Sequence, residues 1–177
     1  LFLKKFLKFQ ISRSANTEEE SAVSTIYGFA FSRSDIEEIY FPKSLIELKE
    51  GWCSDTKKLI RIIISPSNGQ FIFKEDKYLI GKSNENEAEY DKLLFVRCDI
   101  KVFSIPPSVT KICEFVFSNC INLRKVEIPT NSNLQTIGKY AFSESNIEAI
   151  SIPPSVTKIC ENAFYDCKNL RKVEITI

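Results

Sequence analysis

The sequence predicts a repeat solenoid of the α/β leucine-rich-repeat type, with a parallel concave β-sheet, irregular convex turns and one inserted β-hairpin. Residues 105–128 and 152–175 are identical at nineteen of twenty-four positions, and the two blocks begin 47 residues apart. A six-residue cassette of the form apolar-x-x-apolar-x-apolar recurs at steps of 23, 41, 23, 24 and 23 residues. Proline follows four of the cassettes, which disfavours a helix there because proline lacks the backbone N–H. Recurrence at this period predicts stacked coils rather than one globular core.

Each cassette predicts one strand of the concave sheet. Its first, fourth and sixth residues are apolar in all six copies, and the alternation over the last three residues is that of a strand with one buried face. Ile and Val fill many of these positions, and β-branched residues favour strands. The cassettes are residues 36–41, 59–64, 100–105, 123–128, 147–152 and 170–175.

The step of 41 residues predicts one repeat plus an insertion of eighteen residues. Short strand-like runs between Phe71 and Phe95 surround the polar tract 83–87, so we expect a small hairpin that loops off the stack. The predicted organisation is a degraded repeat in residues 1–25, repeats 1–2 in 26–68, the inserted hairpin in 69–97 and repeats 3–6 in 98–177. This organisation predicts a solenoid of about six to seven coils.

The segment that returns from one cassette to the next is predicted to bury apolar residues behind the sheet. We expect its Phe residues to stack ring over ring along the solenoid, with the pair Trp52-Cys53 in the matching place of the second coil. The inward residues of the return segments are predicted to be Leu48, Ile112, Ile137 and Ile159, followed by Phe31, Phe117, Phe142 and Phe164.

Three strings carry a family resemblance: ICENAFYDCKNLRKVEIT, IGKYAFSESNIEAISIPPSV and LKEGWCSDTKKLIRIIISP. They resemble BspA-like leucine-rich repeats, whose unit runs roughly I-x-x-x-A-F-x-x-C-x-x-L-x-x-I-x-I-P. The match covers the chain from Ile26 onward, apart from the inserted hairpin. The resemblance implies a right-handed solenoid with a concave parallel sheet. It also implies a binding scaffold, since many members are surface antigens with a role in adhesion to host cells or matrix.

Composition excludes several functional classes. The net charge is +1, with Lys+Arg 24 against Asp+Glu 23, so composition gives no reason to expect a nucleic-acid partner. The sequence has no His, which excludes histidine-based catalysis, and its five glycines form no phosphate-binding loop, so no cofactor is expected. No apolar run reaches eighteen residues, so no membrane insertion is predicted for this fragment.

Six cysteines stand at 53, 98, 113, 120, 160 and 167, and the spacing C-x6-C occurs twice. The repeat explains this spacing better than a metal site does, because structural zinc sites use closer pairs. We predict buried reduced thiols and no metal. The alternatives are a metal site or one disulfide, for which Cys98 and Cys120 are the candidates because they lie one coil apart.

Glu127 and Glu174 occupy one cassette position two coils apart, which raises the alternative of a carboxylate pair in a carbohydrate-active enzyme. The neighbouring Lys125 and Lys172 would keep both carboxylates ionised. A glycosidase needs one carboxyl with a raised pKa. We therefore predict that the chain is not an enzyme and has no catalytic residue.

The outward cassette positions are the predicted partner-binding surface, because side chains on a rigid sheet lose little entropy on binding. Its C-terminal end is a mosaic of charges, and the second and third cassettes add Ile60, Ile63 and Val102. An alternative is that the hairpin covers the Ile pair. The predicted contact residues are Tyr40, Arg61, Ile63, Lys101, Arg124, Lys125, Glu127, Glu148, Arg171, Lys172 and Glu174.

The predicted function is a protein-binding module in adhesion or cell-surface recognition, with a host or matrix protein as partner. The alternative is an intracellular scaffold, favoured by unpaired cysteines and by the lack of an export signal, so the location stays open. The last residues, 173–177, are predicted to finish on a strand without a polar cap. Solenoids need caps. We expect further repeats downstream or end-to-end self-association through this edge.

Overall fold

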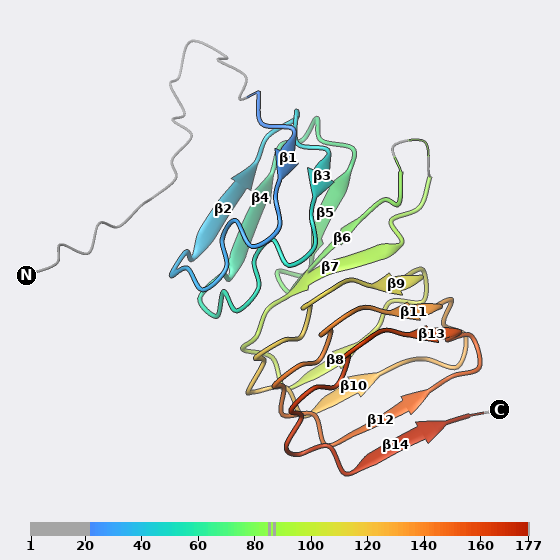
Figure 1. Ribbon diagram of the computed structural model, residues 1–177. Helices are drawn as coiled ribbons and strands as arrows, with labels where there is room; N and C mark the ends of the chain where they lie inside the picture. The colour runs from blue at the N-terminus through green and yellow to red at the C-terminus, as the bar shows by residue number, and fades with distance from the viewer. Residues whose placement is uncertain (1–21, 85, 87, 177) are drawn as a thin grey trace, which may run out of the picture.

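A computed structural model describes residues 22–84, 86 and 88–176, and in those residues the chain winds into repeating coils of strands and turns (Figure 1). The predicted β-solenoid is confirmed. No helix occurs in the described residues, so turns and two-residue strands form the side opposite the cassettes. The degraded repeat predicted for residues 1–25 lies largely outside them.

The last residues of all six cassettes form parallel strands, with equal cassette positions paired from coil to coil. Lys125, for example, pairs with Val102 on one side and with Ala149 on the other, and Ala149 pairs with Lys172. The strands are β2 (Glu38–Phe41), β4 (Arg61–Ile64), β8 (Val102–Ser104), β10 (Lys125–Glu127), β12 (Ala149–Ile152) and β14 (Lys172–Ile175).

These cassette strands form two sheets, not the single sheet that the cassettes predict. β2 pairs with β4, and β8, β10, β12 and β14 form a four-stranded sheet (Figure 1). No pairing joins β4 to β8. The break falls where the sequence carries its insertion, because the chain between β4 and β8 makes additional strands.

The return segments form a second set of short strands. β1 (Thr25–Ile26) pairs with β3 (Glu47–Leu48) in parallel, and β9 (Lys111–Ile112), β11 (Thr136–Ile137) and β13 (Lys158–Ile159) pair in the same way. Residues of equal rank in the repeat again lie side by side, so both sides of each coil are held in register.

The insertion is a hairpin built into the wall of return strands. β5 (Phe71–Lys74) and β6 (Tyr78–Gly81) are antiparallel, and β6 also pairs with β7 (Lys92–Val96). β7 pairs in parallel with β9, so it is the return strand of the third coil. The prediction that the hairpin loops off the stack is wrong, because β5 and β6 extend a six-stranded sheet.

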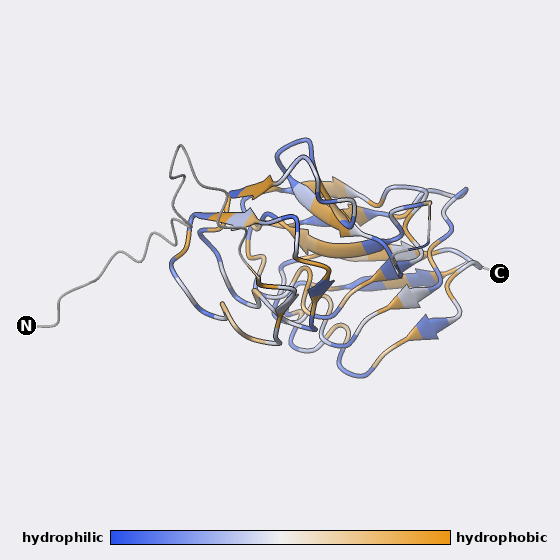
Figure 2. Cartoon of the chain, turned by 90° about the horizontal axis from the view of Figure 1, so that it is seen from above, coloured by the Kyte–Doolittle hydropathy of each residue, from blue (hydrophilic) through white to orange (hydrophobic). Residues whose placement is uncertain are grey.

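The hairpin and β7 separate two hydrophobic cores. All four residues of β6 are buried: Leu79 packs in the N-terminal core, whereas Tyr78 and Ile80 pack in the C-terminal core. Hydrophobic segments accordingly run along strands in the interior of the molecule, and its peripheral turns are mostly hydrophilic (Figure 2). The N-terminal core contains Ile39, Phe41, Leu45, Trp52, Leu59, Ile62, Phe71, Leu79 and Phe95.

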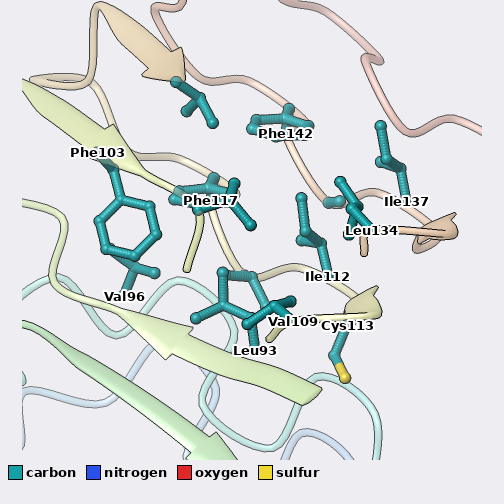
Figure 3. Packing of buried hydrophobic residues seen from close by; sticks show 14 of the residues in the cluster. Leu93, Val96, Phe103, Val109, Ile112, Cys113, Phe117, Leu134, Ile137 and Phe142 are labelled. Atoms are coloured by element: carbon teal, nitrogen blue, oxygen red, sulfur yellow. The ribbon is translucent and has the colours of Figure 1, made fainter. Parts of the chain in front are cut away.

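The predicted Phe stack is present in the C-terminal coils. The side chains of Phe117 and Phe142 lie next to each other in the C-terminal core (Figure 3), with ring centroids 4.8 Å apart. The ring centroids of Phe142 and Phe164 lie 5.1 Å apart, and the planes are inclined by 5° in both pairs. In the second coil Trp52 replaces Phe and meets Phe31 and Phe41 edge to face. The rings of the N-terminal core therefore pack in a different geometry from those of the C-terminal coils.

In five of the six coils, the turn between return strand and cassette contains two residues with positive φ, four positions apart. One member is the glycine Gly51, and a Cβ there would lie 2.9 Å from the ring of Phe29 and 3.1 Å from that of Phe115. The third coil has no such pair among the described residues. The pairs are Phe29 and Arg33, Gly51 and Asp55, Phe115 and Asn119, Tyr140 and Glu144, and Asn162 and Asp166.

Replacing the central ring of the stack should destabilise the protein strongly. Phe142→Ala should lower the free energy of unfolding by about 3–5 kcal/mol, because Phe142 is fully buried and contacts a ring on each side. Chemical denaturation measures this loss. Phe164→Ala is the control and should cost less, because Phe164 is only partly buried. Equal losses would show that stacking contributes little.

Candidate functional site

The predicted contact residues lie on the outward faces of the cassette strands or directly before them. Ten of the eleven are exposed, and only Ile63 is half-buried. They do not form one surface, because Tyr40, Arg61 and Ile63 belong to the β2–β4 sheet. The other eight lie on the four-stranded sheet, and we call this surface the cassette face: Lys101, Arg124, Lys125, Glu127, Glu148, Arg171, Lys172 and Glu174.

Backbone hydrogen bonds fix the first outward position of every coil on the cassette face. The N–H of Arg124 donates to the C=O of Lys101 (2.8 Å), that of Glu148 to the C=O of Arg124 (3.0 Å), and that of Arg171 to the C=O of Glu148 (2.9 Å). The four side chains therefore stand in one row at the spacing of the strands. Such a row can bind a partner with little loss of backbone entropy.

Charges on the cassette face divide into paired and unpaired groups. Lys125 Nζ lies 2.7 Å from Glu127 Oε1, and Lys172 Nζ lies 2.6 Å from Glu174 Oε1. Each of these carboxylates thus pairs with the lysine of its own strand. No ion pair involves Lys101, Arg124 or Arg171 within the described part of the chain. The row is therefore basic, interrupted by Glu148.

The apolar group around β2 and β4 is smaller than the sequence indicates. Tyr40 and Ile60 are 39% and 46% exposed, so the hairpin does not cover Ile60. Val102 is also exposed, but it begins the four-stranded sheet and does not pair with β4. Arg61 Nη1 forms an ion pair with Glu38 Oε2 at 3.2 Å. These residues make a mixed surface on two sheets rather than one apolar centre.

A groove of about 900 Å³, which the sequence did not predict, lies at the break between the two halves of the solenoid. One wall is the segment 46–52, which includes β3. The other comes from Phe71 of β5, residues 82–84 after β6, and strands β7 and β9. Apolar side chains in it include Leu48, Phe71 and Leu94, and the charged ones are Glu47, Lys49, Glu50, Lys82, Lys92, Lys111 and Glu114. No periodic pattern marks this groove, because it arises where the repeat is interrupted.

Two carboxyl groups meet at one end of the groove. Partial burial raises the pKa of Glu50, and the charge and hydrogen bond of Glu114 raise it further. Glu114 Oε1 lies 2.9 Å from Lys111 Nζ, so one lysine faces two carboxylates. Glu50 belongs to the second coil and Glu114 to the fourth, and their contact therefore joins the two halves of the molecule.

The cysteines are not all reduced, contrary to the prediction. Cys98 and Cys120 form a disulfide, with Cα atoms 4.6 Å apart. The other four cysteines are free thiols. Burial raises the pKa of Cys113 to about 12 and also raises the pKa of Cys53 and Cys167, so these thiols are protonated and weakly nucleophilic at neutral pH. In the described residues no three potential ligands gather closely enough to hold a metal ion.

Stacked coils and a rigid outward face define a leucine-rich-repeat protein. The chain belongs to the BspA-type leucine-rich-repeat family, whose repeat region matches residues 7–79 and 89–177 in six copies. No curated protein matches the sequence. The part of the chain that the structure describes contains no helix able to span a membrane.

Three solved structures share the fold at 18–20% sequence identity. A leucine-rich cell surface protein from Faecalibacterium prausnitzii is 20% identical, with a TM-score of 0.64 over 85% of this chain and 45% of that one. The pneumococcal vaccine antigen PcpA is 18% identical, with a TM-score of 0.68 over 88% and 43%. A leucine-rich repeat protein from Eubacterium ventriosum is 18% identical, with a TM-score of 0.59 over 88% and 53%. The chain thus spans about half the length of these proteins.

Breaking the disulfide should destabilise the C-terminal half. The bond closes a loop across a sequence separation of 22 residues, and its loss should lower the free energy of unfolding by about 3 kcal/mol. Denaturant unfolding of the Cys98→Ser/Cys120→Ser variant measures this loss, with Cys160→Ser as the control. Titration of the unfolded protein should find four thiols before reduction and six after it. Six thiols before reduction would contradict the assignment.

The Glu50–Glu114 contact should make stability depend on pH. Because the folded pKa of Glu50 is raised above its ordinary value of 4.5, its stabilising contribution is complete below pH 4.5 and is lost as the pH rises through the folded pKa. Glu50→Gln should therefore raise the melting temperature at pH 7 relative to the unmodified protein. The corresponding gain in the free energy of unfolding should be less than about 1 kcal/mol.

The matched control variant should change the melting temperature in the opposite direction. Lys139 lowers the pKa of Glu161 through a hydrogen bond, so Glu161→Gln should lower the melting temperature at pH 7. Differential scanning fluorimetry from pH 4 to pH 8 compares the two variants. A melting temperature that falls in both would show that the two carboxyl groups at the groove do not repel.

Proposed function

We propose that the chain is a protein-binding module that acts in adhesion or recognition at a cell surface, and that its contact surface is the cassette face. The single observation that supports this most is the row of exposed Lys101, Arg124 and Arg171, which ladder hydrogen bonds hold in place and which form no ion pair within the described residues, although Glu148 stands between the two arginines. A row of free cations attracts acidic proteins and speeds their association.

The similar solved structures support a role in recognition at a cell surface, but they do not identify the binding partner. Two of the similar structures are a cell surface protein and a vaccine antigen. The Cys98–Cys120 disulfide favours an oxidising location over the alternative of an intracellular scaffold, because cytosolic thiols are kept reduced. The partner in this proposal is a host or matrix protein with an acidic contact surface.

Antibody labelling of intact cells tests the location. An antibody raised against this chain should label cells of the source organism without permeabilisation. Labelling that appears only after permeabilisation would reject the adhesion proposal and leave the scaffold alternative. The disulfide can be tested in the same material, by blocking free thiols at lysis.

Charge reversal tests the contact surface. The triple variant Lys101→Glu, Arg124→Glu and Arg171→Glu should bind host cells or immobilised matrix proteins at least about tenfold more weakly, which corresponds to about 1.4 kcal/mol. The control variant changes net charge equally at exposed lysines outside the cassette face: Lys74→Glu, Lys158→Glu and Lys168→Glu. Equal loss in both variants would show a general charge effect rather than a contact site.

A further inference from the structure

The return strand β3 has one edge that no other strand of the described chain uses. β3 pairs with β1 alone. In the coils whose return strand has a following return strand beside it, the carbonyls accept from that strand: the C=O of Ile26 accepts from the N–H of Lys49, and the C=O of Ile112 from the N–H of Gly138, both at 2.9 Å. The equivalent carbonyls of the second coil are those of Ile46 and Leu48, and no hydrogen bond to either occurs in the described residues.

The hairpin explains this open edge. In an uninterrupted stack the return strand of the third coil would lie beside β3. That strand is β7, and it pairs instead with β6 on one side and with β9 on the other. The displacement of β7 leaves the 900 Å³ groove along β3.

The size and lining of the groove suit a polypeptide segment. Its volume lies in the upper part of the range of ligand pockets, about 300–1,000 Å³. Leu48, Phe71 and Leu94 give it an apolar lining, while Ile46 is exposed at its edge. An open strand edge beside apolar side chains is the arrangement that binds peptides by strand addition.

Charge in the groove indicates an acidic side chain on the peptide. Lys49 and Lys111 are paired with Glu47 and Glu114. Lys82 lies over the ring of Tyr90 at 5.2 Å, and Lys92 Nζ donates to the C=O of Ser83 at 3.2 Å. Neither lysine has a carboxylate partner among the described residues, so the wall that carries them is positive.

We propose that this groove is a second binding site, which takes an extended peptide with an acidic side chain as an added strand parallel to β3. The peptide N–H groups donate to the C=O groups of Ile46 and Leu48, and its carboxylate pairs with Lys82 and Lys92. The site is separate from the cassette face and does not depend on the function proposed for that face.

A peptide copied from the chain itself is the direct probe. In the fifth coil, the N–H groups of Gln135 and Gly138 donate to the C=O groups of Thr110 and Ile112, which correspond to Ile46 and Leu48. The synthetic octapeptide QEIGKYAF repeats residues 135–142 with Thr136→Glu. Titrated into the full chain, it should shift the NMR signals of residues 46–51 and 92–94, and the version with Lys in place of that Glu should bind at least about tenfold more weakly.

Backbone methylation separates strand addition from loose apolar binding. Methylation of the peptide nitrogen that corresponds to Gly138 should weaken binding at least about tenfold, because it removes the bond to Leu48. Methylation at the Ile137 nitrogen is the control and should matter less, because that N–H makes no bond to the preceding coil. Equal effects of the two methylations would overturn the proposal.

Lysine variants test the charge. Lys82→Glu/Lys92→Glu should weaken binding of QEIGKYAF at least about tenfold and strengthen binding of the Lys version. Lys74→Glu/Lys77→Glu is the control, at the other end of the hairpin. No binding at a peptide concentration of about 1 mM, or shifts confined to the cassette face, would also overturn the proposal.

Discussion

Backbone hydrogen bonds between successive coils are the constraint on which the rest of the structure depends. They run in both directions: the return strand of one coil donates back to the coil before it, as from Gly138 to Ile112, and the turn donates forward, as from Phe117 to Ala141 at 2.7 Å. Two opposed sets of bonds hold each coil in register on both sides. The stacked Phe rings and the row of side chains on the cassette face follow from that register.

The left-handed backbone conformation of the turns contributes to the same hydrogen bonds between successive coils. The residues with positive φ are themselves donors to the next coil: Phe115 to Lys139, Asn119 to Ser143 and Glu144 to Tyr165. A left-handed conformation costs roughly 1–2 kcal/mol for a residue with a side chain. The hydrogen bonds and ring contacts of the stack offset that cost, because the conformation directs each N–H along the axis of the solenoid.

The sequence predicted the structural features that recur with the repeat period, and it did not predict the features that occur only once. The six cassettes and the Phe stack have a period, and the structure confirms their placement. Of the predicted inward residues of the return segments, Ile112 and Ile137 are fully buried, whereas Ile159 is 43% exposed, because in the described residues no further coil covers it. The split of the cassette sheet, the groove and the Glu50–Glu114 contact depend on where β7 lies relative to β3, which no periodicity encodes. The sequence placed Cys98 and Cys120 one coil apart, but the disulfide was weighed as an alternative only, because side chains in line on neighbouring coils seldom meet the dihedral angle that a disulfide requires. The contact role of the cassette face remains a prediction, since exposure alone does not name a partner.

The hairpin between the two cores has a consequence for how this protein can change over evolutionary time. Because β6 is buried on both faces, the hydrophobic cores of the two stacks are both bounded by this one strand, although the edge of β3 stays open. A core with a fixed inner boundary tolerates the gain or loss of units at its outer end without repacking of the other core. The insertion therefore makes two independently variable arrays out of one, and the length of either can drift while the junction stays fixed.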